Sequence, residues 1–151
     1  MRKLFFISAW TGIISIAIAI VVISYWLIAP YEVMTFYGTY GKETRTLEVP
    51  TANTVKSGEY LALRESYCKN LSYPATVSRT FIDGISYQVP VYVSNIPVGC
   101  YGKDGESIDY VYIPKALPPG KYRIETVYSF QVNPLRTVHF SLITDQFIIV
   151  K

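Results

Sequence analysis

The N-terminal segment from Leu4 to Ala29 contains no charged residue. A helix needs roughly 20 apolar residues to cross about 30 Å of hydrocarbon, and this run is longer. A cleaved signal peptide would have a shorter apolar core, followed by small residues at the cut. The Ala-x-Ala pattern at Ala17 lies inside the run, and a cut after Ala29 would leave Pro30 at the new terminus. The sequence therefore predicts an uncleaved transmembrane helix over residues 4–29.

The orientation of this helix follows from the charges beside it. Arg2 and Lys3 precede the apolar run, and basic residues stay on the cytoplasmic side of a membrane. We expect residues 1–3 in the cytoplasm and residues 30–151 outside it, periplasmic or extracellular, with the helix in the inner (cytoplasmic) membrane. The short basic N-terminus and the simple organisation favour a bacterial or bacteriophage origin.

Four small residues lie along one face of the predicted helix: Ser8, Gly12, Ser15 and Ala19. Their spacing of four, three and four residues places them on one stripe, where a second helix could approach closely. The stripe is a candidate helix-packing surface, either for a second copy of the chain or for another protein. The alternative is that the residues have no partner, because small residues are common in membrane helices.

The remainder of the chain is nearly neutral. The whole chain has 14 basic residues, and two of them, Arg2 and Lys3, precede the predicted helix. The segment beyond the helix therefore has 12 basic residues against 11 acidic ones. A nucleic-acid binder would be expected to concentrate basic residues on one face, whereas these charges are scattered with alternating sign. We therefore expect no nucleic-acid partner.

Short alternating apolar runs, bounded by Gly, Pro, Asn and Asp, recur along the outer segment, and no run keeps a helical period. Tyrosine, which favours strands, is abundant there. These patterns predict a single all-β domain over residues 30–151, with seven or eight antiparallel strands. The candidate strands are residues 32–40, 44–49, 59–68, 75–82, 85–94, 108–113, 121–132 and 137–150, the last with a break near Thr144.

Three turns are also predicted. Asp83 and Gly84 suit a two-residue type I′ hairpin loop. Lys103 to Gly105 is typical of another hairpin tip, and Asn133 with Pro134 should join two neighbouring antiparallel strands.

The segment IPKALPPGKYRIETVYSF resembles a corner of fibronectin type III and other immunoglobulin-like sandwiches. In those folds a leucine and a Pro-Gly turn lead into a strand opened by tyrosine, and Leu117, Pro119, Gly120 and Tyr122 occupy these places here. SGEYLALRESYC resembles a second strand of the fold and TDQFIIV a closing strand. The resemblance implies an immunoglobulin-like β-sandwich. The chain departs from antibody domains, because it has no tryptophan beyond Trp26 and its cysteine spacing is too short.

Cys68 and Cys100 are the two cysteines of the chain. In an oxidising compartment a lone pair of cysteines forms a disulfide. We therefore predict a Cys68–Cys100 bond, the alternative being two buried thiols if the domain faced the cytoplasm.

Residues suited to catalysis or metal binding are sparse. The one histidine, His139, lies between Val138 and Phe140 and is expected to be an ordinary strand residue. It would have to serve every Cys-His or Ser-His arrangement and every zinc site. Asp104, Glu106 and Asp109 could bind calcium, although a solvated hairpin tip explains them as well. We expect no enzyme, no cofactor and no metal.

These observations favour a non-enzymatic membrane protein that presents a β-sandwich binding or assembly module outside the cytoplasm. Its expected partners are the lipid bilayer and another envelope or membrane protein. Arg64, Arg79, Tyr110 and Tyr112 are the predicted exposed members of a contact surface, because tyrosine and arginine are favoured in binding hot spots. The alternatives are a structural subunit of a virion or secretion assembly and a phage-encoded envelope protein that alters the host surface.

Overall fold

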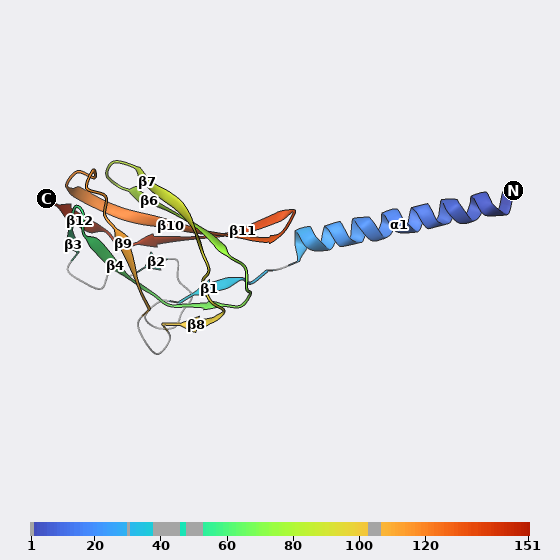
Figure 1. Ribbon diagram of the computed structural model, residues 1–151, viewed down its shortest axis with the longest axis horizontal. Coiled ribbons are helices and arrows are strands. Elements are labelled where there is room, and N and C mark those ends of the chain that lie inside the picture. The colour runs from blue at the N-terminus through green and yellow to red at the C-terminus, as the bar shows by residue number, and fades with distance from the viewer. Residues whose placement is uncertain (1, 30, 38–45, 48–52, 103–106) are drawn as a thin grey trace.

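A computed structural model of the chain describes residues 2–29, 31–37, 46–47, 53–102 and 107–151, with backbone only for residues 2–10, 46 and 47. Its first element, α1, is a helix of 27 residues from Arg2 to Ile28 that projects from a β domain (Figure 1). Among the described residues, α1 is the one helix that is both long enough and apolar enough to cross a membrane. No residue of α1 from Thr11 to Ile28 is buried inside the domain, which suits a helix whose surroundings are lipid.

The described part of the remaining chain is β structure. Its strands are β1 (Met34–Phe36), β2 (Thr46–Leu47), β3 (Thr54–Lys56), β4 (Tyr60–Glu65), β5 (Tyr67–Lys69), β6 (Ala75–Ile82), β7 (Tyr87–Ser94), β8 (Gly99–Tyr101), β9 (Ser107–Tyr112), β10 (Gly120–Asn133), β11 (Arg136–Thr144) and β12 (Phe147–Val150). The predicted β domain with one N-terminal apolar helix is confirmed for these residues. The prediction of seven or eight antiparallel strands is wrong, because the described residues form more and shorter strands and because β2 and β3 pair in parallel.

The long strand β10 organises the larger layer of the domain. Its first residues pair with β12 and its later residues with β11, while β6 lies along its other edge and β7 pairs with β6. The short strands β2 and β3 add to β11 and β12 in parallel. One twisted sheet therefore runs the length of the domain (Figure 1).

The smaller layer consists of two short sheets that lie end to end. β4 pairs with β9, and β5 pairs with both β1 and β8, all antiparallel. Because only Ser66 separates β4 from β5, these two strands continue one another, and β8 and β9 both run beside them.

The core lies between the two layers and follows from strict alternation along the strands. In β10, buried residues alternate with more exposed ones from Tyr122 to Val132. Phe36 of the smaller layer packs against Tyr128 of the larger one, with ring centroids 5.4 Å apart. The largest buried side chains of the core are Tyr122, Phe81, Phe130, Phe147, Met34 and Leu63.

Most predicted strand positions agree with the described strands, but two of the predicted strands are divided. The predicted strand 59–68 becomes β4 and β5, and the predicted strand 137–150 becomes β11 and β12, broken near Thr144 as expected. β3 and β8 were not predicted, because three-residue strands carry too little alternation to detect.

The predicted type I′ turn at Asp83 and Gly84 is wrong. β6 ends at Ile82 and β7 begins at Tyr87, so the loop is longer than two residues. A type I′ turn needs positive φ at both central residues, and only Asp83 has it, with φ of 72°. Gly84 is required for a different reason, since a Cβ there would lie 2.4 Å from the Tyr122 ring.

The other two turns have different outcomes. Asn133 and Pro134 do join neighbouring antiparallel strands, β10 and β11. The predicted tip at Lys103 to Gly105 lies outside the described residues. The flanking strands β8 and β9 pair with β5 and β4.

Candidate contact surface

The solvent face of the β4–β9 sheet is dominated by tyrosine. Tyr60 pairs with Tyr112 across the two strands, and their ring centroids lie 5.4 Å apart. Tyr110 lies two residues along β9 on the same face. The exposed fractions of Tyr60, Tyr110 and Tyr112 are 65%, 61% and 42%. Three large aromatic side chains therefore project into solvent from one small sheet.

Strand alternation gathers these residues. In β4 and β9 the residues between them, Leu61, Leu63 and Val111, are buried in the core, so their neighbours must point outward. Register then places Arg64 opposite Ile108, which is 40% exposed. We call this surface the tyrosine face and define it as Tyr60, Ala62, Arg64, Ile108, Tyr110 and Tyr112. Two of the four predicted contact residues, Tyr110 and Tyr112, are exposed there as expected, whereas Arg64 shares the face but is half-buried.

The predicted exposure of Arg79, the fourth contact residue, is wrong. Arg79 is 7% exposed and forms an ion pair with Asp109 of β9, across the two layers. Its guanidinium also lies 5.6 Å from the centre of the Tyr92 ring. Along β6, Arg79 shares the inward face with Val77 and Phe81, so alternation in the sequence could have placed it inside.

Arg79 belongs to a buried polar group that sequence reasoning missed. We call Glu65, Arg79, Asp109 and Tyr128 the interlayer cluster. Tyr128 of β10 donates a hydrogen bond from its hydroxyl to Oε1 of Glu65, which is 6% exposed, over 3.0 Å. The two bonded pairs of the cluster, Tyr128 with Glu65 and Arg79 with Asp109, therefore connect the layers. Buried polar groups need such hydrogen-bond partners.

Burial controls the protonation of this cluster. Burial, with a smaller contribution from the Asp109 charge, raises the pKa of Glu65 from 4.5 to about 7, although Tyr128 and Arg79 oppose the shift. Burial and the neighbouring Glu65 raise the pKa of Tyr128 well above its ordinary value. The parity of β4 could have revealed Glu65, since Leu61, Leu63 and Glu65 share the inward face.

Other polar side chains of the kinds that serve in catalysis lie on the solvent face of the larger sheet. His139 is a strand residue, as predicted, and is exposed on β11. Its Nδ1 lies 2.8 Å from Oγ of Ser129. The carboxylate of Glu125 accepts a hydrogen bond from Ser141 over 2.9 Å. This arrangement is the ordinary pairing of neighbouring strand side chains.

Only one of the three acidic residues considered for calcium, Asp109, lies within the described residues. Asp104 and Glu106 lie outside the described residues, while Asp109 faces Arg79. Within the described ranges no group of three or more His, Cys, Asp and Glu residues could hold a metal ion.

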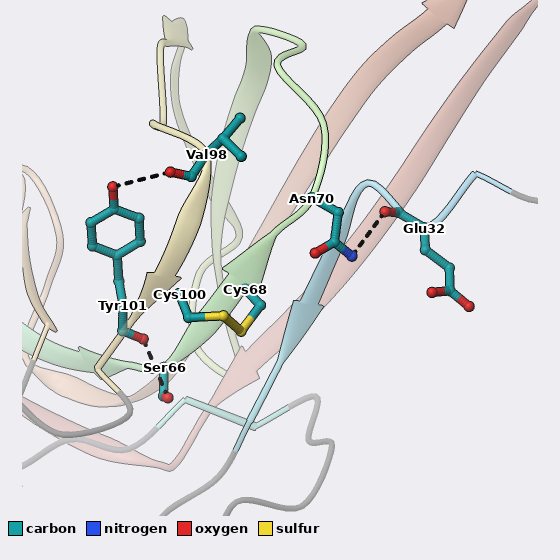
Figure 2. The surroundings of a disulfide bond; sticks show 7 residues. All are labelled: Glu32, Ser66, Cys68, Asn70, Val98, Cys100 and Tyr101. Atoms are coloured by element: carbon teal, nitrogen blue, oxygen red, sulfur yellow. Dashed lines mark hydrogen bonds between the residues drawn. A yellow bond between two sulfur atoms is a disulfide. The ribbon is translucent and has the colours of Figure 1, made fainter.

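The predicted disulfide is confirmed. Cys68 and Cys100 are directly opposite one another on β5 and β8, and their sulfurs are bonded (Figure 2). Nearby, the Asn70 amide donates a hydrogen bond to the carbonyl of Glu32, and Ser66 Oγ donates one to the carbonyl of Tyr101. The disulfide therefore links two adjacent strands of the smaller layer.

The small-residue stripe lies on the described helix. Gly12, Ser15 and Ala19 are exposed, and a Cβ on Gly12 would meet no atom within 4 Å. Ser15 Oγ donates to the Thr11 carbonyl over 2.9 Å. The side chain of Ser8 is outside the described part. Whether the stripe packs against a second helix stays a prediction.

No protein-family model matches the sequence, and no curated protein matches it. Among solved structures, the chain is similar to the alkylpurine DNA glycosylase AlkC of Pseudomonas fluorescens bound to DNA containing an abasic site analogue, with a TM-score of 0.33 and 14% identity. The similarity covers 73% of this chain and 30% of the glycosylase chain. A TM-score of this size carries no argument about fold, DNA binding or catalysis.

Proposed function

We propose that this chain is a membrane-anchored, non-enzymatic binding protein that offers the tyrosine face to another envelope protein outside the cytoplasm. The observation that carries the proposal is the exposure of Tyr60, Tyr110 and Tyr112 on one sheet. Tyrosine combines a large apolar ring with a hydrogen-bonding hydroxyl, and it orders few rotatable bonds on binding. Arg64, which is half-buried, occupies a position on the same face.

An immunoglobulin-like sandwich is the fold we propose for the outer domain. Two features support it. The hydroxyl of Tyr122, near the start of β10, donates to the carbonyl of Pro118 over 3.0 Å, which resembles the tyrosine corner of such folds. The first strands of the domain also pair with both layers, β1 with β5 in the smaller one and then β2 and β3 with β11 and β12 in the larger one.

The disulfide departs from the antibody pattern. In antibody domains the bond joins the two sheets, whereas Cys68 and Cys100 join adjacent strands of one layer. The two layers are instead connected by the core and by the interlayer cluster. The proposal therefore concerns the sandwich architecture and not the antibody family.

Site-specific photocrosslinking in the producing cell tests the proposed contact. A benzophenone amino acid at Tyr110 or Tyr60 should crosslink to a partner protein, because both side chains are more than half exposed on the tyrosine face. The matched control is the same probe at Thr137, an exposed residue of the larger sheet. Equal crosslinking at Thr137 and Tyr110, or none at any position, would overturn the proposed surface.

A structural membrane subunit is the second candidate, favoured by the open stripe at Gly12, Ser15 and Ala19. If α1 packs against its copies there, Gly12→Leu should weaken association in an in-membrane two-hybrid assay, because a large side chain holds the backbones apart. Ile14→Leu, elsewhere on the helix, is the control. Equal signals from wild type and Gly12→Leu would remove this candidate.

A further inference from the structure

Two exposed residues, Pro134 and Leu135, form the turn between β10 and β11. Asn133 fixes the turn, because its Oδ1 accepts a hydrogen bond from the backbone N–H of Leu135 over 2.9 Å. Pro134 adds a fixed φ. Leu135 has no place in the core and is 54% exposed. The hairpin thus presents an exposed leucine at a turn that a side-chain hydrogen bond and a proline hold in place.

This tip is bonded to the end of α1. The side-chain amide of Asn133 donates to the carbonyl of Trp26 over 3.0 Å. Nη1 of Arg136 donates to the carbonyls of Leu27 and Ala29 over 3.0 and 2.6 Å. The last carbonyls of a helix have no partner within the helix, and they carry a partial negative charge that favours a cation.

A ring contact strengthens the same connection. The guanidinium of Arg136 lies 5.5 Å from the centre of the Tyr31 ring, just beyond the helix. The β10–β11 hairpin also extends beyond the rest of the domain toward α1 (Figure 1). Among the described loops of the domain, the β10–β11 hairpin is therefore the one that contacts the end of α1.

These contacts fix the depth of the tip. The uncharged run ends at Ala29, so an α1 that spans a bilayer has its last turn at the boundary between acyl chains and headgroups. Groups bonded directly to the carbonyls of Trp26 and Leu27 must lie at that level. Tyr25 and Trp26 are aromatic residues of the kind that settle there.

We propose that the β10–β11 tip is a second membrane contact, in which Leu135 enters the headgroup and acyl-chain boundary of the leaflet facing the domain. The inference rests on the proposed anchoring role of α1. The bilayer supplies the apolar surroundings that the domain does not give Leu135. Arg136 is a positioning residue, because it holds the tip against the helix end.

Depth-dependent fluorescence quenching tests this contact in the full-length protein. With Cys68 and Cys100 bonded, a cysteine introduced at position 135 can carry a single environment-sensitive dye without reduction of the protein. The protein is reconstituted into phosphatidylcholine and phosphatidylglycerol vesicles whose lipids carry a nitroxide quencher at a shallow or a deep position. Leu135→Cys should be quenched by the shallow nitroxide and little by the deep one.

Two further labels separate failure of the tip from failure of the anchor. Ile20→Cys, in the middle of α1, should be quenched by the deep nitroxide, and Ile85→Cys, an exposed apolar residue between β6 and β7, by neither. A label at 135 that behaves like the one at 85, while Ile20→Cys is quenched, overturns the tip contact alone. Loss of quenching at 20 overturns the anchor and the inference together.

A matched pair of arginine variants tests the positioning role. In the labelled Leu135→Cys protein, Arg136→Ala should reduce shallow quenching, because it removes the bonds to Leu27 and Ala29. Arg123→Ala removes a surface ion pair with Asp83 at the other end of β10 and should leave the quenching unchanged. The same change in both variants would show that Arg136 does not position the tip.

Discussion

The charged residues of β4, β6 and β9 differ in how deeply they are buried, and residue type alone does not reveal the difference. Arg64 and Arg79 are both strand arginines, yet one lies on the tyrosine face and the other is buried against Asp109. Glu65, next to Arg64, points into the core and is hydrogen-bonded by Tyr128. A buried ion pair is costly to break, because removing one partner leaves the other charge without compensation.

The raised pKa of Glu65 predicts that the domain loses stability as pH rises. The pKa is about 7 in the folded protein against 4.5 ordinarily, so the folded state binds more protons between these values. The free energy of unfolding should therefore decrease from pH 4.5 to about 7, by at most roughly 3 kcal/mol. Denaturant unfolding of the full-length protein in detergent, measured across this range, checks the slope.

Two substitutions assign that slope to Glu65. Glu65→Gln keeps an acceptor for Tyr128 but cannot ionise, so the decrease of stability with pH should become smaller. Glu125→Gln, on the solvent face of β10, removes an equal charge outside the core. An unchanged slope in Glu65→Gln would show that another group titrates.

Gly84 and Gly120 offer a matched test of close packing around one ring. A Cβ at Gly84 would lie 2.4 Å from the Tyr122 ring, whereas one at Gly120 would lie 3.4 Å from it. Gly84→Ala should therefore destabilise the domain by about 1 to 3 kcal/mol, because the buried ring must shift. Gly120→Ala should cost much less. Thermal unfolding of both variants measures the difference, and equal costs would contradict the packing account.

At the scale of elements, short strands depend on the bonds that hold them in place. β5 and β8 have three residues each, which is too little backbone pairing to be stable alone. The disulfide joins their central residues. Next to Cys68 on β5, Nζ of Lys69 donates hydrogen bonds to the carbonyls of Tyr73 and Ile96 over 2.6 and 2.5 Å. Covalent and polar contacts thus compensate for short strands.

Removal of the disulfide should destabilise the outer domain. The bonded cysteines are separated by 32 residues, for which loop-closure entropy predicts a loss of roughly 3 to 4 kcal/mol. The paired variant Cys68→Ala with Cys100→Ala should lower the unfolding midpoint and leave α1 in the membrane. Thiol labelling of denatured, unreduced wild type should find no free cysteine. Full labelling of both would contradict the bond.

At the scale of the whole molecule, α1 and the β domain are connected through the helix end. Asn133 and Arg136 reach from the far end of the chain to the carbonyls of Trp26, Leu27 and Ala29. The tyrosine face begins at Tyr60, and β4 with β5 runs from there toward the helix end of the domain. The proposed protein contact and the proposed lipid contact therefore lie on different parts of one domain.

The topology prediction belongs to this scale. Arg2 and Lys3 should remain in the cytoplasm and Lys151 should lie outside it, because basic residues flanking a membrane helix are retained. Alkaline phosphatase fused after Lys151 should be active. Moving the charges by Arg2→Glu and Lys3→Glu should lower that activity. Mass spectrometry that finds a mature terminus near Pro30 would contradict the uncleaved anchor.

The sequence by itself determined the features that depend on local pattern. The uncharged run from Leu4 to Ala29 predicted α1, since spanning length and hydropathy are properties of consecutive residues. Alternation predicted most of the strands, and the two cysteines allowed a single intramolecular pairing. Tyr110 and Tyr112, which were predicted to be exposed because tyrosine is favoured in binding hot spots, are exposed.

Tertiary structure alone decided which distant residues meet. The ion pair of Arg79 with Asp109 and the bond of Tyr128 to Glu65 depend on how two layers face each other. Gly84 matches a hairpin turn in the sequence, yet its role is to make room for the Tyr122 ring. The contact of Arg136 with the end of α1 likewise joins residues more than 100 positions apart. Such pairings follow from the packing of whole elements, and no periodicity along the chain encodes them.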